Sequence, residues 1–302
     1  MKHYFNILRP LNLLIIAAVM CIIKYGFFER LGVATALGTF EFLLLVCATT
    51  FIAAGGNIIN DIHDTETDRI NKPKKLLVGR HISEKNADYL YIAFTSIGVL
   101  MGLILSNMIG HKAIAAVFII VAALLYGYAT TFKNIFLIGN VVIASLVAFT
   151  PLLLVLFDIF PTIENNILAP TLKASKTILH VAIFAFGINL IRELIKDIQD
   201  TNGDKNAGRN TIPVVLGKKR STYIAFAITL VLIVASVYYL YTFMFSYKYL
   251  MRYFLGAVIG PLLYILVKIF NAEMPQNYKH ISILLKVVMG TGICTLLFLP
   301  FL

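Results

Sequence analysis

Acidic residues, tryptophan and cysteine are scarce in this sequence, and each shortage narrows what the protein can be. Only 15 of the 302 residues are Asp or Glu, and only 14% of all residues are charged. A soluble domain of this length needs more charge on its surface, so the composition excludes one and predicts that the bilayer is the solvent. Trp is absent, which leaves Tyr to form any aromatic belt at the membrane surface. The cysteines lie in apolar runs without metal-ligand spacing, which favours a packing role: Cys21, Cys47 and Cys294.

Hydrophobic residues make up 59% of the chain and gather into runs of the length that a membrane helix needs. No linker rich in Ser, Pro or Gly and no separate polar domain interrupts these runs. We therefore expect an all-α integral membrane protein with a single transmembrane domain over residues 1–302 and about nine spans. The expected spans are 11–28, 38–60, 87–108, 113–131, 135–158, 176–197, 221–243, 251–271 and 281–301.

The basic residues predict the orientation of these spans. If the N-terminus is cytoplasmic, about 18 of the 26 Lys and Arg residues fall in cytoplasmic segments, as the positive-inside rule requires. We therefore expect a multi-pass protein of the cell (inner) membrane with a cytoplasmic N-terminus. The net charge of +11 is then explained by topology and by an inner face that attracts anions. No basic stripe stands free of the membrane, so we expect the bilayer, and no nucleic acid, as a partner.

Eight of the 15 acidic residues fall in two short segments that close the second and the sixth expected spans. The first segment reads DIHDTETD from residue 61, and the second reads DIQDTNGD from residue 197. Five of the eight positions are identical at a constant offset of 136 residues, which is 197 minus 61. The segments 57–75 and 189–210 are therefore interpreted as an internal repeat. An even number of spans separates the two copies, so the repeat is parallel and both motifs emerge on one membrane face.

Helical spacing places the acidic side chains of each motif on one side of a helix. At about 100° per residue, each set spans an arc of roughly 60° to 80°. Two facing rows of carboxylates repel each other unless cations lie between them, and ligands that are all oxygen suit Mg²⁺. The first set comprises Asn57, Asp61, Asp64 and Asp68, and the second comprises Asn189, Glu193, Asp197, Asp200 and Asp204.

Basic residues accompany both acidic rows. Carboxylates, a metal ion and a rim of Lys and Arg together describe a site for a diphosphate. A single motif of this kind is as readily explained as a solvated surface, but two copies at one offset on one face favour a site. The basic residues concerned are Arg69, Lys72, Lys74 and Lys75 after the first row, Arg192, Lys196, Lys205 and Arg209 around the second, and Lys133 after the fourth span.

These residues carry a resemblance to a known family. The pattern from Asn60 to Asp68 is similar to the NDxxDxxxD motif of the UbiA superfamily of membrane prenyltransferases, and the pattern from Asp197 to Asp204 is similar to its second Asp-rich motif. Within that superfamily, the run RELIKDIQD from Arg192 most resembles the second motif of digeranylgeranylglyceryl phosphate synthases. The sequence KLLVGR from residue 75 departs from a Pro-rich stretch that is frequent in the family. This departure leaves the acceptor open.

The resemblance implies nine helices around a central cavity and Mg²⁺-dependent transfer of a polyprenyl, here geranylgeranyl, group from its diphosphate to a lipophilic acceptor. The acceptor that it favours is the hydroxyl of a prenylglyceryl phosphate. It implies one Mg²⁺ on Asp61, Asp64 and Asp68 and a second on Asp197, Asp200 and Asp204. The remaining candidates are expected to bind substrate: Asn57 and Asn60 by orienting water or metal ligands, Lys133, Arg69, Lys72 and Lys196 through phosphate oxygens, Glu193 as a metal ligand or as partner of Arg192, and Tyr126 or Tyr128 by shielding a carbocation.

Other functions remain open from the sequence. An aromatic-ring acceptor, such as a quinone, homogentisate or tetrapyrrole precursor, needs the same diphosphate chemistry. A membrane terpene cyclase ionises a diphosphate without an acceptor. A cation transporter is disfavoured because its carboxylates lie near the bilayer midplane, whereas these lie at helix ends beside many Lys and Arg. Lys286, in the middle of the last span, either faces inward with a functional role or extends its side chain along the helix toward the membrane surface.

Overall fold

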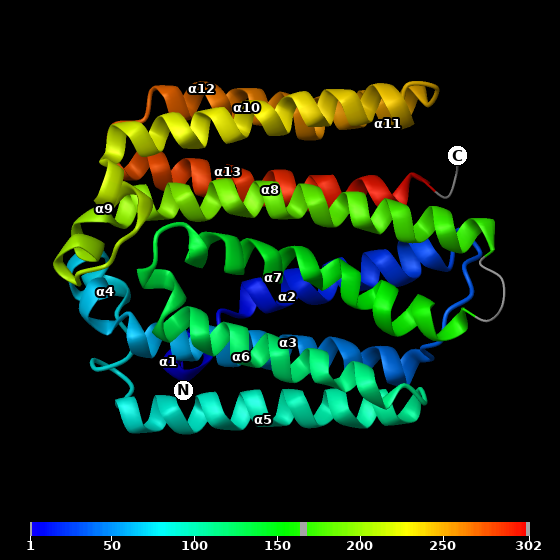
Figure 1. Ribbon diagram of the computed structural model, residues 1–302, viewed down its shortest axis with the longest axis horizontal. Helices are drawn as coiled ribbons and strands as arrows, with labels where there is room; N and C mark the ends of the chain where they lie inside the picture. Colours follow the sequence, from blue (N-terminus) through cyan, green and yellow to red (C-terminus); the bar gives the residue numbers. More distant parts are fainter. Residues whose placement is uncertain (1, 164–167, 300–302) are drawn as a thin grey trace.

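The structure is a computed structural model that describes residues 2–163 and 168–299. Within these ranges, nine helices are long and apolar enough to cross a membrane. Figure 1 shows them side by side, with their axes along the long dimension of the molecule. The spans are Pro10–Phe28, which begins with α2 (Pro10–Cys21), α3 (Thr39–His63), α5 (Glu84–Met108), Lys112–Thr130 with α6 (Ala116–Thr130), Ile138–Thr162 with α7 (Ile138–Leu154), α8 (Ala169–Asn206), α10 (Lys218–Phe243), Lys248–Phe270 with α11 (Lys248–Phe254) and α12 (Gly260–Phe270), and Pro275–Leu297 with α13 (Pro275–Cys294).

The expected all-α membrane fold is confirmed, and the expected spans differ from the observed ones mainly at their ends. The largest difference is the sixth span, expected at 176–197 and observed as the single helix α8, Ala169–Asn206. Hydropathy marks where the bilayer ends, whereas a helix continues as long as its backbone hydrogen bonds and packing persist. The extra turns at its C-terminal end carry the whole second acidic motif.

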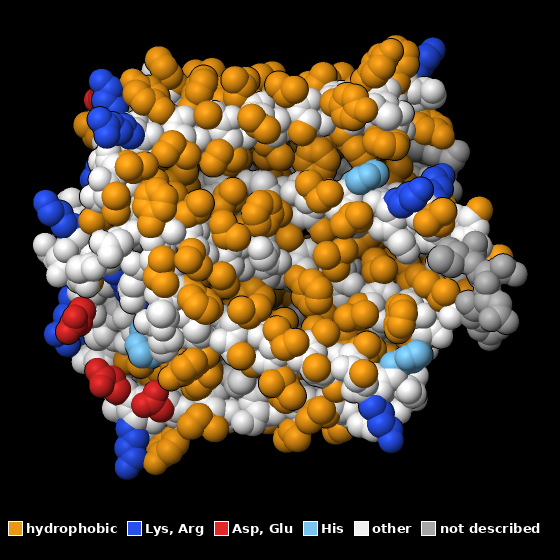
Figure 2. Space-filling view, viewed as in Figure 1, with side chains coloured by type: hydrophobic (Ala, Val, Ile, Leu, Met, Phe, Trp, Pro, Cys, Tyr) orange, Lys and Arg blue, Asp and Glu red, His pale blue; other side chains and the backbone are white. Residues whose placement is uncertain are grey.

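The two ends of the bundle differ in structure. The short helices α1 (Lys2–Ile7), α4 (Thr65–Asn71) and α9 (Ile212–Leu216) lie together at one end of the bundle, and α13 runs from this end toward the opposite one (Figure 1). Figure 2 shows a broad apolar band along the molecule, with charged side chains at its two extremities. Apolar side chains cover a transmembrane protein where lipid tails contact it, so this band marks the membrane-facing surface.

Small residues let neighbouring helices approach closely. On α5, a Cβ at Gly98 would lie 3.0 Å from the carbonyl oxygen of Ala48 on α3, and a Cβ at Gly102 would lie 2.1 Å from the ring of Phe118 on α6. A larger side chain at either position would force the helices apart. This close packing of α3, α5 and α6 supports the helix that carries the first acidic motif, because lipid tails drive no hydrophobic association between membrane helices.

A buried ion pair joins the first and fifth spans at the end far from α4 and α9. The Nζ of Lys24 lies 3.0 Å from Oδ2 of Asp158, and both side chains are almost completely buried. Lys24 also donates to the carbonyl of Leu37, while the N–H of Leu37 donates to Asp158, each at 2.8 Å. Lys24 and Asp158 lie in the π-helical segments Ile22–Phe28 and Val155–Ile159. The ion pair and its hydrogen bonds to the backbone of Leu37 therefore hold the first and fifth spans together at this end of the bundle.

Candidate active site

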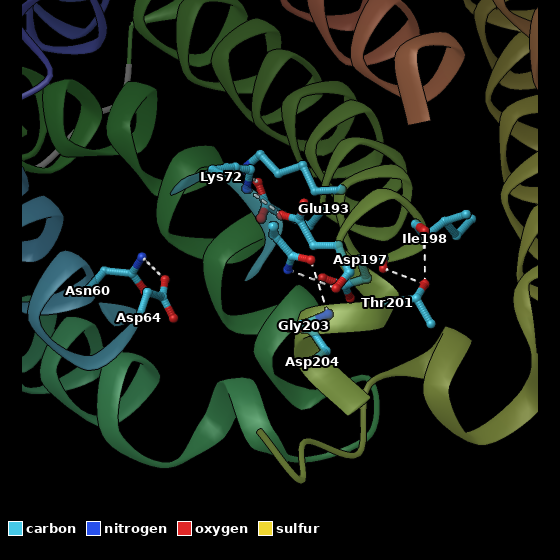
Figure 3. Close-up of polar contacts among 12 residues, drawn as sticks. Asn60, Asp64, Lys72, Glu193, Asp197, Ile198, Thr201, Gly203 and Asp204 are labelled. Atoms are coloured by element: carbon cyan, nitrogen blue, oxygen red, sulfur yellow. Dashed lines mark hydrogen bonds and ion pairs between the residues drawn. The ribbon is translucent and has the colours of Figure 1, made fainter. Parts of the chain in front are cut away.

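A polar chamber of about 620 Å³ lies at the end of the bundle where α4 and α9 are found. All six aspartates predicted from the two motifs line it, so the structure brings together residues more than 130 positions apart in the sequence. Figure 3 shows Asn60 and Asp64 on the α3 side of the chamber and Glu193, Asp197 and Asp204 on the α8 side. The charged residues of its lining are Arg9, Asp61, Asp64, Asp68, Lys72, Lys74, Lys133, Glu193, Lys196, Asp197, Asp200, Asp204 and Arg209.

The first motif bends at its middle aspartate. Helix α3 ends at His63, Asp64 has φ −96° and ψ 1°, and α4 resumes at Thr65. The backbone hydrogen bonds continue through this bend, from the N–H of Asp64 to the carbonyl of Asn60 and from the N–H of Asp68 to that of Asp64. The continuous helix assumed for the first acidic row is therefore wrong in this detail. The bend swings α4 toward α8 and keeps all three aspartates in the chamber.

The second motif stands on an unbroken helix. Asp197, Asp200 and Asp204 all lie on α8, and Oδ2 of Asp197 accepts a hydrogen bond of 2.7 Å from the amide of Asn140 on α7. Asp200 forms an ion pair with Lys72, which follows α4. The spacing argument for this motif is thus confirmed by the helix itself, and its partners come from two other elements of the fold.

Basic side chains join the two motifs across the chamber. Arg209 contacts both, at 2.5 Å from Oδ1 of Asp64 and 3.3 Å from Oδ1 of Asp204. The buried Lys133 lies 2.7 Å from the same oxygen of Asp64. On the other side, Arg9 lies 2.5 Å from Oδ1 of Asp61. Each of these contacts is a charge-assisted interaction, which fixes the geometry more firmly than neutral hydrogen bonds do.

The side chain of Asn71 adds an uncharged link between the motifs. Its amide donates to the carbonyl of Asp200 at 2.9 Å, and its Oδ1 accepts from the N–H of Gly203 at 3.0 Å. A Cβ at Gly203 would lie 2.3 Å from the Nδ2 of Asn71, so only glycine allows this approach. The end of α4 is therefore held directly against α8.

The pKa values of the first motif differ because its aspartates have different neighbours. Burial favours a raised pKa for Asp64, but the cations Lys133 and Arg209 outweigh burial and lower the pKa overall. Burial raises the pKa of Asp68 to about 6, although Lys72 opposes it and Asp64 and Asp61 reinforce it. A divalent cation beside Asp68 would stabilise its charged form. The cations beside Asp64 thus stabilise its charged form already, whereas the charged form of Asp68 would gain most from a metal ion.

The chemistry of the chamber fits Mg²⁺. Its ligand candidates are carboxylate and amide oxygens, the hard donors that Mg²⁺ prefers. The Oδ1 of Asn60 is buried and has no hydrogen-bond partner among the described residues, although its amide donates to Asp64 at 2.5 Å. In the part of the chain that the structure describes, no three Asp, Glu, His or Cys side chains converge on one metal position, and each aspartate contact described above is made with Lys, Arg or Asn. Metal binding would therefore require these carboxylates to turn from their cations.

A second, mainly apolar chamber of about 300 Å³ adjoins the first. The two share Arg9, Asn60, Tyr128, Glu193 and Lys196. Beyond this junction, the walls come from several spans and are mostly aliphatic or aromatic, with Ile16, Ile52, Phe118, Val121, Leu125, Leu146, Phe149 and Leu153 among them. An anionic head group in the polar chamber would thus lie next to a space for a hydrocarbon tail.

Four sequence candidates lie outside the polar chamber: Arg69, Tyr126, Asn57 and Arg192, of which Asn57 and Arg192 line the apolar chamber. Arg69 is exposed on α4 and lines neither chamber. Tyr126 is 48% exposed and stacks on Tyr91 with ring centroids 6.3 Å apart, so it points away from both chambers. Asn57 lines the apolar chamber and donates to the carbonyl of Leu8 at 3.0 Å, which ties α3 to the chain before the first span.

Four other residues line or contact the site, although the sequence predicted them only as neighbours or alternatives, or did not predict them at all. Arg9 and Asn140 each bind a motif aspartate, and Arg209 bridges the two motifs. Tyr128 lines both chambers, two residues after Tyr126. A sequence signal for Arg9 and Asn140 is their position, because Arg9 comes just before the first expected span and Asn140 near the start of the fifth.

Side chains that suit a metal-bound diphosphate, beside a chamber that suits an isoprenoid tail, place this chain among the membrane prenyltransferases. More narrowly, the chain belongs to the UbiA prenyltransferase family, whose model matches residues 12–283. The membrane fold, the family and the enzyme class expected from the sequence are thereby confirmed.

Curated relatives share the family over most of their length. The chain is 33% identical over 236 residues to the digeranylgeranylglyceryl phosphate synthase of Thermococcus kodakarensis, which covers 78% of this chain and 76% of that protein. It is 30% identical over 261 residues to the synthase of the same name from Methanosphaera stadtmanae, and this match covers 86% of this chain and 85% of that protein.

Solved structures share the fold. A structure described for digeranylgeranylglyceryl phosphate synthase superposes with a TM-score of 0.58 at 24% identity, covering 98% of this chain and 96% of that one. A UbiA homolog from Archaeoglobus fulgidus bound to DMAPP and Mg²⁺ superposes with a TM-score of 0.57 at 18% identity, covering 96% and 98%. At these identities the likeness concerns the arrangement of the helices.

Proposed function

We propose that this chain is a Mg²⁺-dependent prenyltransferase that moves a geranylgeranyl group from its diphosphate to the hydroxyl of a prenylglyceryl phosphate. The observation that carries this proposal is the junction of the two chambers. Two facing rows of aspartate, with Lys and Arg between them, open directly into an apolar space at Tyr128, Glu193 and Lys196. The names of the curated relatives support the same acceptor, and the UbiA homolog with Mg²⁺ and DMAPP supports the same metal and donor class.

The reaction breaks the bond between C1 of the allylic chain and the diphosphate oxygen, and it forms an ether bond between C1 and the acceptor oxygen. The hydroxyl proton leaves, and diphosphate is the other product. Bound Mg²⁺ would stabilise the negative charge that develops on the departing diphosphate. Asp61, Asp64 and Asp68 would hold one ion, and Asp197, Asp200 and Asp204 a second.

The chain's own cations have a separate task in this proposal. Lys72, Lys133 and Arg209 bind aspartates in the structure and stand at the edge of the space that a diphosphate would fill. With the carboxylates engaged in holding a metal ion, these cations would neutralise diphosphate oxygens. Such preorganised charge needs little reorganisation when the diphosphate departs, because these side chains already stand in place. Tyr128 presents its ring where the allylic carbocation would form, which favours that cation.

We further propose that one transmembrane domain performs the reaction at the cytoplasmic face of the cell membrane. Helix α1 lies at the end of the bundle where α4 and α9 are found (Figure 1), and the polar chamber lies at that end. The distribution of Lys and Arg favours a cytoplasmic N-terminus. Labelling of single cysteines introduced at Arg80 and Lys248 in intact cells tests this orientation. Only the second position is expected to react with an impermeant reagent.

The decisive assay uses purified protein in detergent with labelled geranylgeranyl diphosphate, with and without geranylgeranylglyceryl phosphate, in Mg²⁺ and in EDTA. Transfer is expected only with both acceptor and metal. Asp64→Asn and Asp200→Asn are expected to lose at least about a hundredfold in rate, because each removes a charged oxygen ligand. Asp88→Asn, an exposed aspartate on α5, is the matched control and is expected to retain the wild-type rate.

Other results would redirect the assignment. Metal-dependent loss of diphosphate without this product would keep the ionisation chemistry and favour an aromatic acceptor or a cyclisation. No binding or consumption of any prenyl diphosphate would refute the prenyl-transfer proposal for this chain, and cation transport would then be tested.

A further inference from the structure

A basic cluster lines the apolar chamber and reaches the polar chamber at one residue, Lys196. It consists of Arg192 and Lys196 on α8 and Lys286 on α13, which line the chamber from two helices. Ionisable residues inside membrane spans are costly and mark functional positions. The diphosphate chemistry proposed above uses the other chamber, and it gives Lys286 no role.

The cluster contains more positive than negative charge. Glu193 is the one carboxylate in the described lining of this chamber. Its Oε1 accepts hydrogen bonds from both Arg192, at 3.0 Å, and Lys196, at 2.6 Å. Lys286 has no carboxylate within ion-pair distance in residues 2–163 and 168–299, and its Nζ donates to Oδ1 of Asn12 at 3.1 Å. Three cations therefore share a single counter-ion, and the neighbouring Arg9 is already paired with Asp61.

The donors of this cluster are incompletely used. The Nε of Arg192 is buried and has no hydrogen-bond partner in the part of the chain described here. The ammonium of Lys286 has three N–H donors, of which Asn12 accepts one. A ligand that supplies about two negative charges and several acceptor oxygens would satisfy the cluster. A phosphate monoester carries about −1.5 to −2 at neutral pH and offers three acceptor oxygens.

We propose that Lys286, Arg192 and Lys196 bind the phosphate of the lipid acceptor, and that Lys286 makes the enzyme specific for a phosphorylated acceptor. This inference rests on the proposed function. Lys196 lies at the junction with the polar chamber, so a phosphate held here leaves the acceptor hydroxyl near the site of diphosphate departure. The position also keeps the acceptor phosphate apart from the aspartates, which would repel it.

A purely structural role for Lys286 predicts something different. Its bond to Asn12 links α13 to α2, so a structural lysine would lower stability when replaced and would affect both substrates alike. A phosphate-binding lysine would affect the acceptor alone. Replacing it would leave the ligand-free protein as stable as before or more stable, because an unmatched charge leaves a membrane span.

The test compares Lys286→Met and Lys286→Arg with the wild type, and Lys268→Met serves as control for an exposed lysine on α12. Lys286→Met is expected to raise the KM for geranylgeranylglyceryl phosphate about tenfold or more, the usual effect of losing a charged hydrogen bond. The KM for geranylgeranyl diphosphate is expected to stay within about twofold of the wild-type value. Lys286→Arg keeps the charge and is expected to recover most of the acceptor affinity.

Thermal unfolding provides a second readout that needs no turnover. Geranylgeranylglyceryl phosphate is expected to raise the Tm of the wild type and of Lys268→Met, and to raise that of Lys286→Met much less. The same lipid without its phosphate is expected to shift all three proteins equally. An equal phosphate-dependent shift in Lys286→Met, or equal changes in both KM values, would overturn the subsite. If the wild type transfers nothing to this acceptor, the proposed function fails instead, so the two failures are distinguishable.

Discussion

Replacing Asn71 with alanine tests whether the link between α4 and α8 sets the spacing of the two acidic motifs. The side chain makes two hydrogen bonds to the backbone of α8, at Asp200 and Gly203. A hydrogen bond of this kind contributes about 1 kcal/mol net, so the variant weakens the joint by about 2 kcal/mol. If both motifs must stand at one spacing to hold the diphosphate, kcat/KM falls by up to about 30-fold.

The assay is steady-state transfer at saturating Mg²⁺, with Asn202→Ala as the matched control. Asn202 is exposed on the same turn of α8, so its loss should change kcat/KM by less than about twofold. Unfolding of Asn71→Ala in detergent should stay cooperative, since the apolar parts of the described spans do not depend on this contact. Equal kcat/KM values for Asn71→Ala and Asn202→Ala would refute the idea that the joint positions the motifs.

A double variant sharpens the test. In Gly203→Ala the new methyl would lie 2.3 Å from the amide nitrogen of Asn71, so the Asn71 side chain must leave its place. We expect Gly203→Ala alone to be at least as impaired as Asn71→Ala. With the Asn71 side chain already removed, Gly203→Ala should cost nothing further, and alanine favours the helix by up to about 1 kcal/mol. Additive losses would show that the two residues do not act through this contact.

Two further predictions concern other parts of the molecule. Lys24→Met leaves the charge of Asp158 buried and unmatched, so we expect a loss of about 3–5 kcal/mol in stability, seen as a lower Tm, with partial recovery when Asp158→Asn is added. Unchanged Tm in Lys24→Met would contradict a stabilising role. Tyr128→Ala should lower kcat/KM about 3- to 30-fold if its ring faces the carbocation. Tyr128→Phe retains an aromatic ring and should keep most of the rate. Tyr126→Ala should change kcat/KM by less than about twofold. A larger effect at Tyr126 than at Tyr128 would reverse that assignment.

Much of the fold is predictable from the sequence because lipid imposes one simple requirement on every span. Runs of about 20 apolar residues mark the spans, and eight of the nine found among the described residues were expected within six residues of their observed bounds. The expected end of the last span, residue 301, lies outside the described residues. The expected sixth span has 22 residues, whereas the observed helix α8 has 38, so the prediction was 16 residues too short. The difference arises because α8 continues as a helix after it leaves the apolar layer. Its extension depends on contacts such as that of Asn71, and hydropathy carries no information about such contacts.

The acidic rows of the site were predictable for a different reason. Their spacing matches a helical period and is repeated at one offset, so the sequence itself shows two independent copies. Arg9 and Asn140 have no such pattern, since each comes singly from a helix whose place beside the motifs is known only from packing. The bend at Asp64 also matters, because it turns α4 so that Lys72 faces α8 while Arg69 faces outward.

The charges of the two chambers imply different requirements for the two substrates. The described lining of the polar chamber contains seven Asp or Glu side chains and six Lys or Arg side chains, so its formal charge is about −1 before any ligand enters. An anionic diphosphate adds to that excess unless metal ions enter with it, whereas the cluster around Lys286 already has more cations than it needs. Binding of prenyl diphosphate should therefore be lost in EDTA, while binding of the acceptor phosphate should persist, as titrations with each labelled lipid would show. Equal binding of the diphosphate with and without metal would mean that Lys and Arg alone hold it, and the aspartate rows would then need another explanation.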